Sequence, residues 1–142
     1  MFLLDTDHVS VLQRATGHSF EQLIRRLQSV PEENVFLSIV TFHERFRGWT
    51  SLIAKAKTDA SVVLAYQRLR ETLQEFSDVQ LADFDDAAAK VFASYRSQKI
   101  RIGTMDLRIA SIAIANDLTL LTRNTVDFVR VPNLRFEDWT AA

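Results

Sequence analysis

The stretch "IGTMDLRIASIAIANDLTLLTRNTVDF", residues 102–128, decides the fold. Its spacing predicts a helix over 105–116, with Thr104 as N-cap, followed by a short buried strand at 119–122. A carboxylate stands at each end of this unit: Asp106 in the first turn of the helix and Asp127 five residues after the strand. Taken separately, Asp106 is explained by the helix dipole and Asp127 by a turn. Taken together, the two aspartates could instead be ligands of one metal ion.

The rest of the chain repeats this alternation of strands and helices. Further strands are predicted at residues 2–4, 35–37, 79–82 and 134–138, and further helices at 6–14, 19–29 and 85–99. Two long amphipathic helices form a predicted helical hairpin at about 39–76. The strands are apolar throughout rather than alternating, which is typical of a parallel sheet covered on both faces. We therefore expect one α/β domain over 1–142, a three-layer α/β/α sandwich with a central parallel sheet.

Composition narrows the classes of function. The 142 residues suit one domain, and 47% hydrophobic with 25% charged residues is ordinary for a globular protein. The chain has no cysteine, which excludes disulfides, thiolate zinc sites and cysteine nucleophiles. Asp5 interrupts the apolar start too early for a signal peptide or a membrane span, so we expect a cytoplasmic protein without membrane contact. Because the net charge is −1, any binding of nucleic acid must rest on local patches or on a metal.

Two more acids fall in positions comparable to those of Asp106 and Asp127. Asp5 directly follows the first strand, and Glu44 lies in the second turn of the helix after the second strand. Open α/β sheets bind ligands outside the carboxyl ends of their strands, so four carboxylates can reach one edge. Hard cations such as Mg²⁺ prefer oxygen ligands, and they promote phosphodiester cleavage by activating water.

Each acid also has a simpler explanation. Asp5 can cap the following helix, and Glu44 can be a solvated residue opposite the apolar stripe of its helix. Asp106 and Asp127 have the dipole and turn explanations given above. Only the convergence of all four on one edge favours a metal site over these separate roles.

Four segments together resemble the PIN domain family and, more narrowly, the VapC toxins of type II toxin–antitoxin pairs. They are "FLLDTDHVSVL", "LSIVTFHERFRG", the stretch at 102–128 and "VPNLRFEDW", and they run from residue 2 to Trp139. The resemblance implies a three-layer α/β/α fold and Mg²⁺- or Mn²⁺-dependent cleavage of structured RNA such as tRNA. It also implies a VapB-like antitoxin as partner and a homodimer, for which the exposed side of the helical hairpin is the expected surface.

The resemblance also implies roles for single residues. By motif, Asp5 and Asp106 match the metal-binding aspartates, while Glu44 and Asp127 match the supporting acids of the catalytic set. Asn124 lies close enough in sequence to share the role of Asp127. Asp7 departs from the family pattern, because many relatives carry Asn there, and it would add a negative charge to the site.

RNA would have to be held by local basic residues. Those near the acidic segments are Arg14, Arg45, Arg47, Lys99, Arg101, Arg108 and Arg123. A solvated charged face explains most of them. Arg108 and Arg123 are the preferred RNA contacts, because Arg108 lies two residues after Asp106 and Arg123 precedes Asp127.

Other functions remain open at this stage. "LLDTDHV" also resembles the first motif of haloacid-dehalogenase-type phosphatases, which need a later acid pair; Asp85–Asp86 is the only adjacent acid pair that follows a predicted strand. An inert PIN-like module that only binds protein is the other alternative. A zinc protease is excluded because Arg47 replaces the second histidine of H-E-x-x-H. The three histidines, His8, His18 and His43, share no spacing and are expected at the surface or at helix ends.

Overall fold

The fold is built around one parallel sheet. The computed structural model describes residues 1–141, in which five strands follow the order β3-β2-β1-β4-β5 with every neighbouring pair parallel. The predicted α/β class with a central parallel sheet is confirmed. The strands are β1 (Phe2–Leu4), β2 (Val35–Ser38), β3 (Gln80–Ala82), β4 (Thr119–Leu121) and β5 (Phe136–Glu137).

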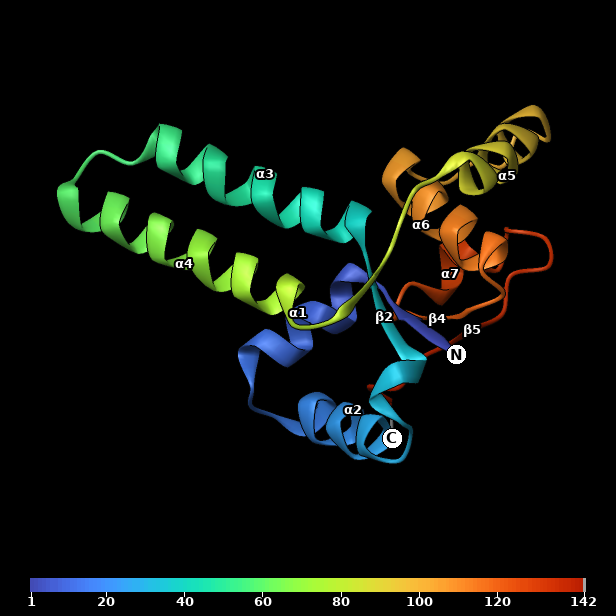
Figure 1. Cartoon of the computed structure of the whole chain (residues 1–142), viewed down its shortest axis with the longest axis horizontal. Coiled ribbons are helices and arrows are strands. Elements are labelled where there is room, and N and C mark those ends of the chain that lie inside the picture. Colours follow the sequence, from blue (N-terminus) through green and yellow to red (C-terminus); the bar gives the residue numbers. More distant parts are fainter. Residues whose placement is uncertain (142) are drawn as a thin grey trace.

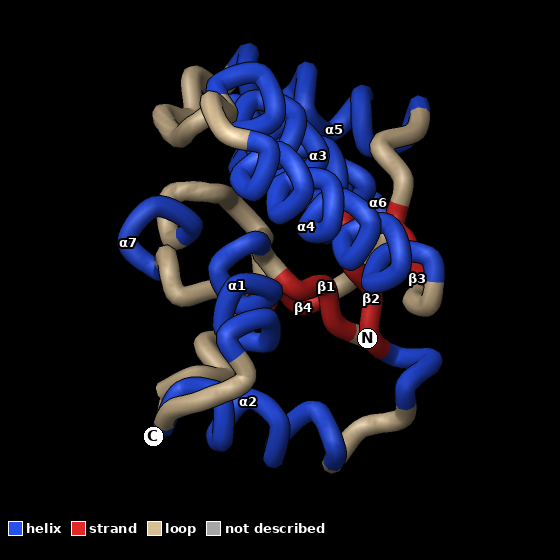
Figure 2. The backbone as a smooth tube through the Cα atoms, turned by 90° about the vertical axis from the view of Figure 1, so that its left-hand side faces the viewer, coloured by secondary structure: helices blue, strands red, loops and turns tan. Residues whose placement is uncertain are grey.

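Helices connect the strands and cover the sheet on both sides (Figure 1). They are α1 (Thr6–Arg14), α2 (His18–Gln28), α3 (Ile39–Lys55), α4 (Asp59–Ser77), α5 (Asp86–Ser97), α6 (Thr104–Ala115) and the short α7 (Thr125–Phe128), with a 3₁₀ turn at Glu32–Asn34. Figure 2 shows α2 below the strands, α1 beside them and α3 to α6 above them. Among these helices, none combines the length and hydropathy that crossing a bilayer requires.

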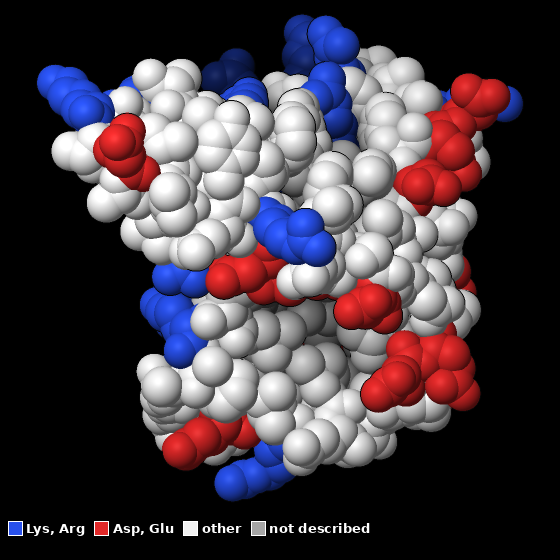
Figure 3. Space-filling view, turned by 60° about the vertical axis from the view of Figure 1, so that its left-hand side comes forward, with Lys and Arg blue, Asp and Glu red and all other residues white. Residues whose placement is uncertain are grey.

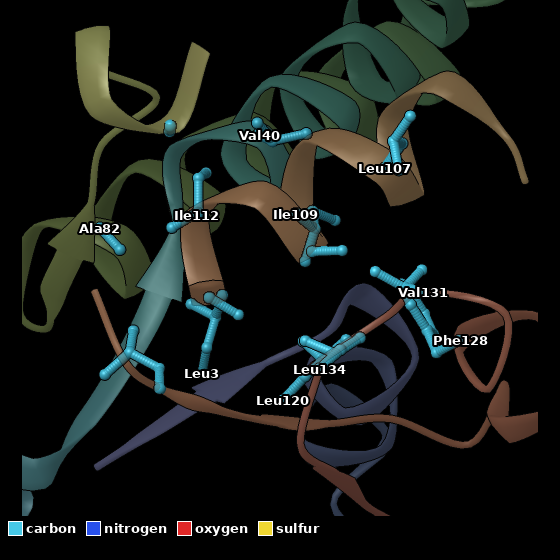
Figure 4. Packing of buried hydrophobic residues seen from close by; sticks show 14 of the residues in the cluster. Leu3, Val40, Ala82, Leu107, Ile109, Ile112, Leu120, Phe128, Val131 and Leu134 are labelled. Carbon is cyan, nitrogen blue, oxygen red and sulfur yellow. The ribbon is translucent and has the colours of Figure 1, made fainter. Parts of the chain in front are cut away.

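Each central strand sends alternate side chains into two separate cores. Leu3 and Leu120 pack with Ile109 and Ile112 of α6 on one face (Figure 4). Leu4 packs on the other face with residues of α1 and α2. Burial on both faces explains why the strands look continuously apolar in sequence.

The α3–α4 pair extends beyond the sheet as an antiparallel helical hairpin (Figure 1). Its helices are tied together by a hydrogen bond from Trp49 Nε1 to Thr72 Oγ1 (2.8 Å) and by the Phe42 and Phe76 rings, whose centroids lie 5.3 Å apart. Because the hairpin leaves the sheet, its apolar stripe is only partly covered, and Phe46 is 44% exposed.

Helix starts follow the predicted capping with one exception. The side chain of Ser38 accepts a hydrogen bond from Val40 N (2.9 Å), as predicted for the start of α3. The prediction of Thr104 as N-cap of α6 is wrong by one residue, because Thr104 is already helical and Gly103 is the N-cap. Gly103 offers no side chain, and its carbonyl instead accepts the first helical bond, from Leu107 N (2.9 Å).

Candidate active site

The candidate site lies where the strand order reverses, between β1 and β4. This is the point at which open α/β sheets form a crevice at their carboxyl edge. Asp5 directly follows β1, and its backbone N–H donates to Leu121 O at the end of β4 (2.9 Å). Its carboxylate is only 4% exposed and accepts hydrogen bonds from Thr6 N (2.8 Å) and Thr122 Oγ1 (2.8 Å). Asp5 is therefore the N-cap of α1 and the innermost acid of the crevice.

Glu44 reaches this crevice from α3. Its Oε1 accepts a hydrogen bond from Thr6 Oγ1 (3.3 Å), and the same hydroxyl lies 3.2 Å from Thr41 Oγ1. Glu44 is half-buried, so the simpler explanation of a freely solvated residue does not hold. Since Thr6 also donates its backbone N–H to Asp5, one threonine connects two of the four acids.

Asp127 is connected to Asp5 through the loop after β4. Asn124 Nδ2 donates to Asp127 Oδ2 (2.9 Å), and Asn124 N donates to Thr122 Oγ1 (3.0 Å). Thr122 in turn holds Asp5. Asn124 is therefore close to Asp127, as its sequence position suggested, and its side-chain amide orients the Asp127 carboxylate by donating a hydrogen bond to it.

Asp106 joins the other acids through charge. It lies in the first turn of α6, on a helix whose Ala110 and Ala113 are fully buried. Burial raises the pKa of Asp106, and the negative charges of Asp127 and Asp7 raise it further. No hydrogen bond from the described residues lowers the pKa of Asp106.

The same repulsion acts on Asp5 and Glu44. Burial raises the pKa of Asp5 to about 7, with added repulsion from Asp7 and Asp106 that the bonds from Thr122 and Thr6 only partly offset. Burial also raises the pKa of Glu44; the charge of Asp106 adds to this, while the Thr6 hydroxyl lowers it. The structure thus brings Asp5, Glu44, Asp106 and Asp127 into one electrostatic environment.

Such a set suits a hard divalent cation. All its donors are oxygens, and a cation would relieve the mutual repulsion that raises these pKa values. Within residues 1–141, no three Asp, Glu or His side chains are close enough to form a ready-made metal cluster. Mg²⁺ commonly uses one or two carboxylates and keeps several water molecules, so a site for this ion does not require three side chains that all touch it.

Asp7 adds a fifth carboxylate with its own partners. It accepts hydrogen bonds from His8 Nδ1 (2.8 Å), Arg123 N (2.9 Å) and Thr122 Oγ1 (3.2 Å). Burial alone would raise the pKa of Asp7, but the bonds from His8 and Arg123 lower it below its usual value. Asp7 is therefore a fixed negative charge behind Asp5.

His8 lies at a helix end, in the first turn of α1, but it is not at the surface. It is 0% exposed, and its Nε2 accepts a hydrogen bond from Trp139 N (3.2 Å). Nδ1 therefore carries the proton that it donates to Asp7. Trp139 lies 131 residues away in sequence, so no local pattern could predict this partner.

The predicted RNA contacts occupy different surroundings. Arg108 lies on the face of α6 opposite Asp106, with its guanidinium carbon 5.6 Å from the centroid of the Phe92 ring on α5. Arg123 is exposed beside the crevice, and its backbone N–H holds Asp7. The acid pair that a phosphatase would need is a helix start, because Asp85 caps α5 by accepting from Ala88 N (3.0 Å).

Comparison with known proteins gives a consistent result. The family model of the PIN domain matches residues 2–134. Toxin FitB of Neisseria gonorrhoeae (strain ATCC 700825 / FA 1090) is 28% identical over 98% of this chain and 99% of its own. The tRNA(fMet)-specific endonuclease VapC of Shigella flexneri is 37% identical over 45% of this chain and 52% of its own. The crystal structure of FitAcB from Neisseria gonorrhoeae superposes with a TM-score of 0.75 and 27% identity, covering 100% of both chains. The chain therefore belongs to the PIN domain family.

Proposed function

We propose that this protein is a metal-dependent endoribonuclease and the toxin of a type II toxin–antitoxin pair. The observation that carries the proposal is the convergence of Asp5, Glu44, Asp106 and Asp127 at the strand-reversal crevice, where burial and mutual repulsion raise three of their pKa values. The Neisseria relative, matched over nearly its full length, is named a toxin, and the Shigella relative, matched over 52% of its length, is named an endonuclease. Both names support the proposal.

The chain's own residues would divide the work. Asp5 and Asp106 would hold the cation, Mg²⁺ or Mn²⁺, with Glu44 and Asp127 in support. The bound cation would supply charge at the scissile phosphate and a water of lowered pKa. Thr122 and Thr6 keep the Asp5 carboxylate in one orientation.

An RNA strand in the crevice would pass close to exposed basic groups. Arg123 is the better placed of the two predicted contacts, since its backbone N–H donates to Asp7, which lies next to Asp5 in the crevice. Arg108 would have to leave the Phe92 ring to reach the same strand. The substrate that we propose is structured RNA such as tRNA, which the name of the Shigella relative supports. Such an enzyme would act in the cytoplasm.

The surface also offers features that suit protein partners. A groove of about 860 Å³ lies between α1, α2 and the start of β3, with apolar walls that include Leu12, Ile24 and Val79. Its rim carries Glu32, Glu33 and Asp78. Figure 3 shows a hollow with uncharged walls and acidic groups beside it. An apolar antitoxin segment with basic flanks would match these walls and this rim.

Homodimer formation is the second interaction that we propose. Large apolar side chains are exposed on the hairpin formed by α3 and α4, namely Phe46, Leu52, Val63, Leu64, Tyr66 and Leu73. A cluster of this kind on a projecting element is typical of a protein interface. Analytical ultracentrifugation of wild type and a Tyr66→Glu, Leu73→Glu variant tests this; two proteins with equal mass in solution would rule out the hairpin as a dimer surface.

The function is tested by incubating antitoxin-free protein with total cellular RNA, with Mg²⁺ or with EDTA. Asp106→Asn tests the candidate site, and Asp86→Asn is a control that removes the same charge from the exposed start of α5. We expect discrete fragments that require metal, persist with Asp86→Asn and disappear with Asp106→Asn. Equal cleavage by both variants would place the activity elsewhere, and a complete lack of cleavage by wild type would favour the inert binding module.

A further inference from the structure

A polar groove leads away from the candidate active site along α1 and α3. Two adjoining hollows, of about 280 and 450 Å³, share Ser10, Arg45 and Trp49 in their walls. The smaller hollow begins at Thr6 and Glu44, and the larger one continues to Arg68 on α4. We call the combined space the Arg45 groove, since Arg45 lines both parts.

Arg45 is half-buried in this groove, whereas Arg14 and Arg68, the other two cations that line it, are exposed. One terminal nitrogen donates to Ser10 Oγ, while the buried Nε has no partner among residues 1–141. No carboxylate of the described chain lies within ion-pair distance of its guanidinium. A guanidinium offers five donors, and an unsatisfied buried donor calls for an explanation such as an absent acceptor.

The acids that line the same groove already have donors of their own. Glu71 pairs with Arg68 (2.9 Å), and Glu75 accepts a hydrogen bond from Gln13 Nε2 (2.7 Å). Glu44 belongs to the candidate active site and accepts from Thr6. The neutral donors Gln13 and Thr6 leave Glu75 and Glu44 negatively charged, and both charges act on Arg45. What Arg45 still offers a ligand is its buried Nε donor, one residue beyond Glu44.

Trp49 supplies a flat apolar surface beside this charge. Its indole N–H is fixed by Thr72 Oγ1 (2.8 Å), and the residue lines both hollows. The wall between Glu44 and Leu52 is open at Gly48, where an added Cβ would meet nothing within 4 Å. A phosphate donor next to an immobilised aromatic ring is the combination with which proteins hold single-stranded nucleic acid.

We infer that the Arg45 groove binds the RNA strand next to the cleavage point. The Arg45 guanidinium, supported by Ser10, takes the phosphate that neighbours the scissile one, and Trp49 stacks on an unpaired base. This inference rests on the proposed ribonuclease function. It restricts the substrate at this position to an unpaired segment, because a paired base could not reach the indole.

The test measures binding apart from cleavage. The Asp106→Asn protein, which is expected to bind RNA without cutting it, is titrated with a fluorescent single-stranded oligoribonucleotide by anisotropy at several salt concentrations. Arg45→Gln is compared with Arg135→Gln, which removes the same charge from an exposed arginine paired with Asp117. Circular dichroism melting confirms that each variant is folded.

Arg45→Gln is expected to raise Kd about tenfold, since charge-assisted bonds to phosphate are lost. The slope of log K against log salt should fall by about 0.7, the value for one phosphate contact on a single strand. Arg45→Lys should keep this slope, because lysine keeps the charge. Trp49→Leu should weaken binding about tenfold without changing the slope. Arg135→Gln should leave both quantities as they are.

The outcomes separate this inference from the proposed function. Equal Kd values and equal salt slopes for Arg45→Gln and Arg135→Gln would overturn the inference. In active protein, Arg45→Gln should raise KM about tenfold with kcat within about twofold. If wild type binds the oligonucleotide through Arg45 yet never cleaves RNA, the proposed function fails and the binding groove stands.

Discussion

Replacing Asp5 with asparagine should stabilise the metal-free protein at about pH 8 and leave it nearly unchanged at about pH 4. Asp5 is 4% exposed, and its pKa is about 7 in the fold against 3.8 in the unfolded chain. Between these two values the folded state binds more protons than the unfolded state. The free energy of unfolding of the wild type therefore falls as pH rises through this window.

The magnitude follows from the width of the window. A pKa that rises from 3.8 to about 7 corresponds to a loss on the order of 4 kcal/mol, at about 1.4 kcal/mol per unit of pKa. Asparagine cannot ionise and escapes this loss. Its amide can still accept from Thr6 N, while Thr122 Oγ1 can donate to Asp7 Oδ2, 3.2 Å away. The raised pKa values of Glu44 and Asp106 act in both proteins and largely cancel in the difference.

Urea unfolding in EDTA, followed by circular dichroism from about pH 4 to pH 8, measures this effect. Asp83→Asn is the control, since Asp83 is exposed and loses the same charge. Mg²⁺ or Mn²⁺ at about a hundredfold excess over Kd should restore roughly 2.7 kcal/mol to the wild type and little to Asp5→Asn. Parallel pH curves for wild type and Asp5→Asn would show that Asp5 does not carry a strained buried charge.

Three further substitutions separate the site from the scaffold. Thr122→Val removes a bond that lowers the pKa of Asp5, so cleavage at about pH 7 should fall about tenfold and the acidic limb of the pH–rate profile should move to higher pH; an unmoved limb would contradict this. Asp85→Ala should cost about 1 kcal/mol in urea unfolding through its lost cap and leave RNA cleavage intact, whereas a phosphatase would lose activity. Ile112→Ala should cost about 2–5 kcal/mol in the same assay without changing the metal requirement, and a smaller cost would mean that the core closes around the cavity.

Much of the fold was predictable because burial on both faces leaves a local pattern. Residues such as Leu3 and Leu4 point into different cores, so each strand appears as a continuous apolar run. The positions of Asp5 and Asp106 follow from the same reasoning, since strand ends and helix starts share one edge of a parallel sheet. Their neighbourhood could thus be predicted, while their binding of a cation stays a prediction.

The supporting contacts of the site could not be predicted, because they join distant segments. Thr6 and Glu44 are 38 residues apart, and Asp5 and Thr122 are 117 apart. Side-chain direction also escapes sequence reasoning: Arg108 seemed close to Asp106, yet two residues along a helix place it on the opposite face, against Phe92. Arg45 is one of the basic residues near the acidic segments in sequence, but only the fold places it in a groove whose other wall is α1.

The most direct test of the account is the chemistry of the cleaved ends. Purified tRNA would be cut by the wild type in ¹⁸O-labelled water with Mg²⁺, and the fragments analysed by mass spectrometry. If the four acids serve a metal-activated water, the new ends are a 5′-phosphate carrying one ¹⁸O and a 3′-hydroxyl, and Asp106→Asn yields neither. A 2′,3′-cyclic phosphate formed equally well in EDTA would show that the RNA's own 2′-hydroxyl attacks, and would contradict the account.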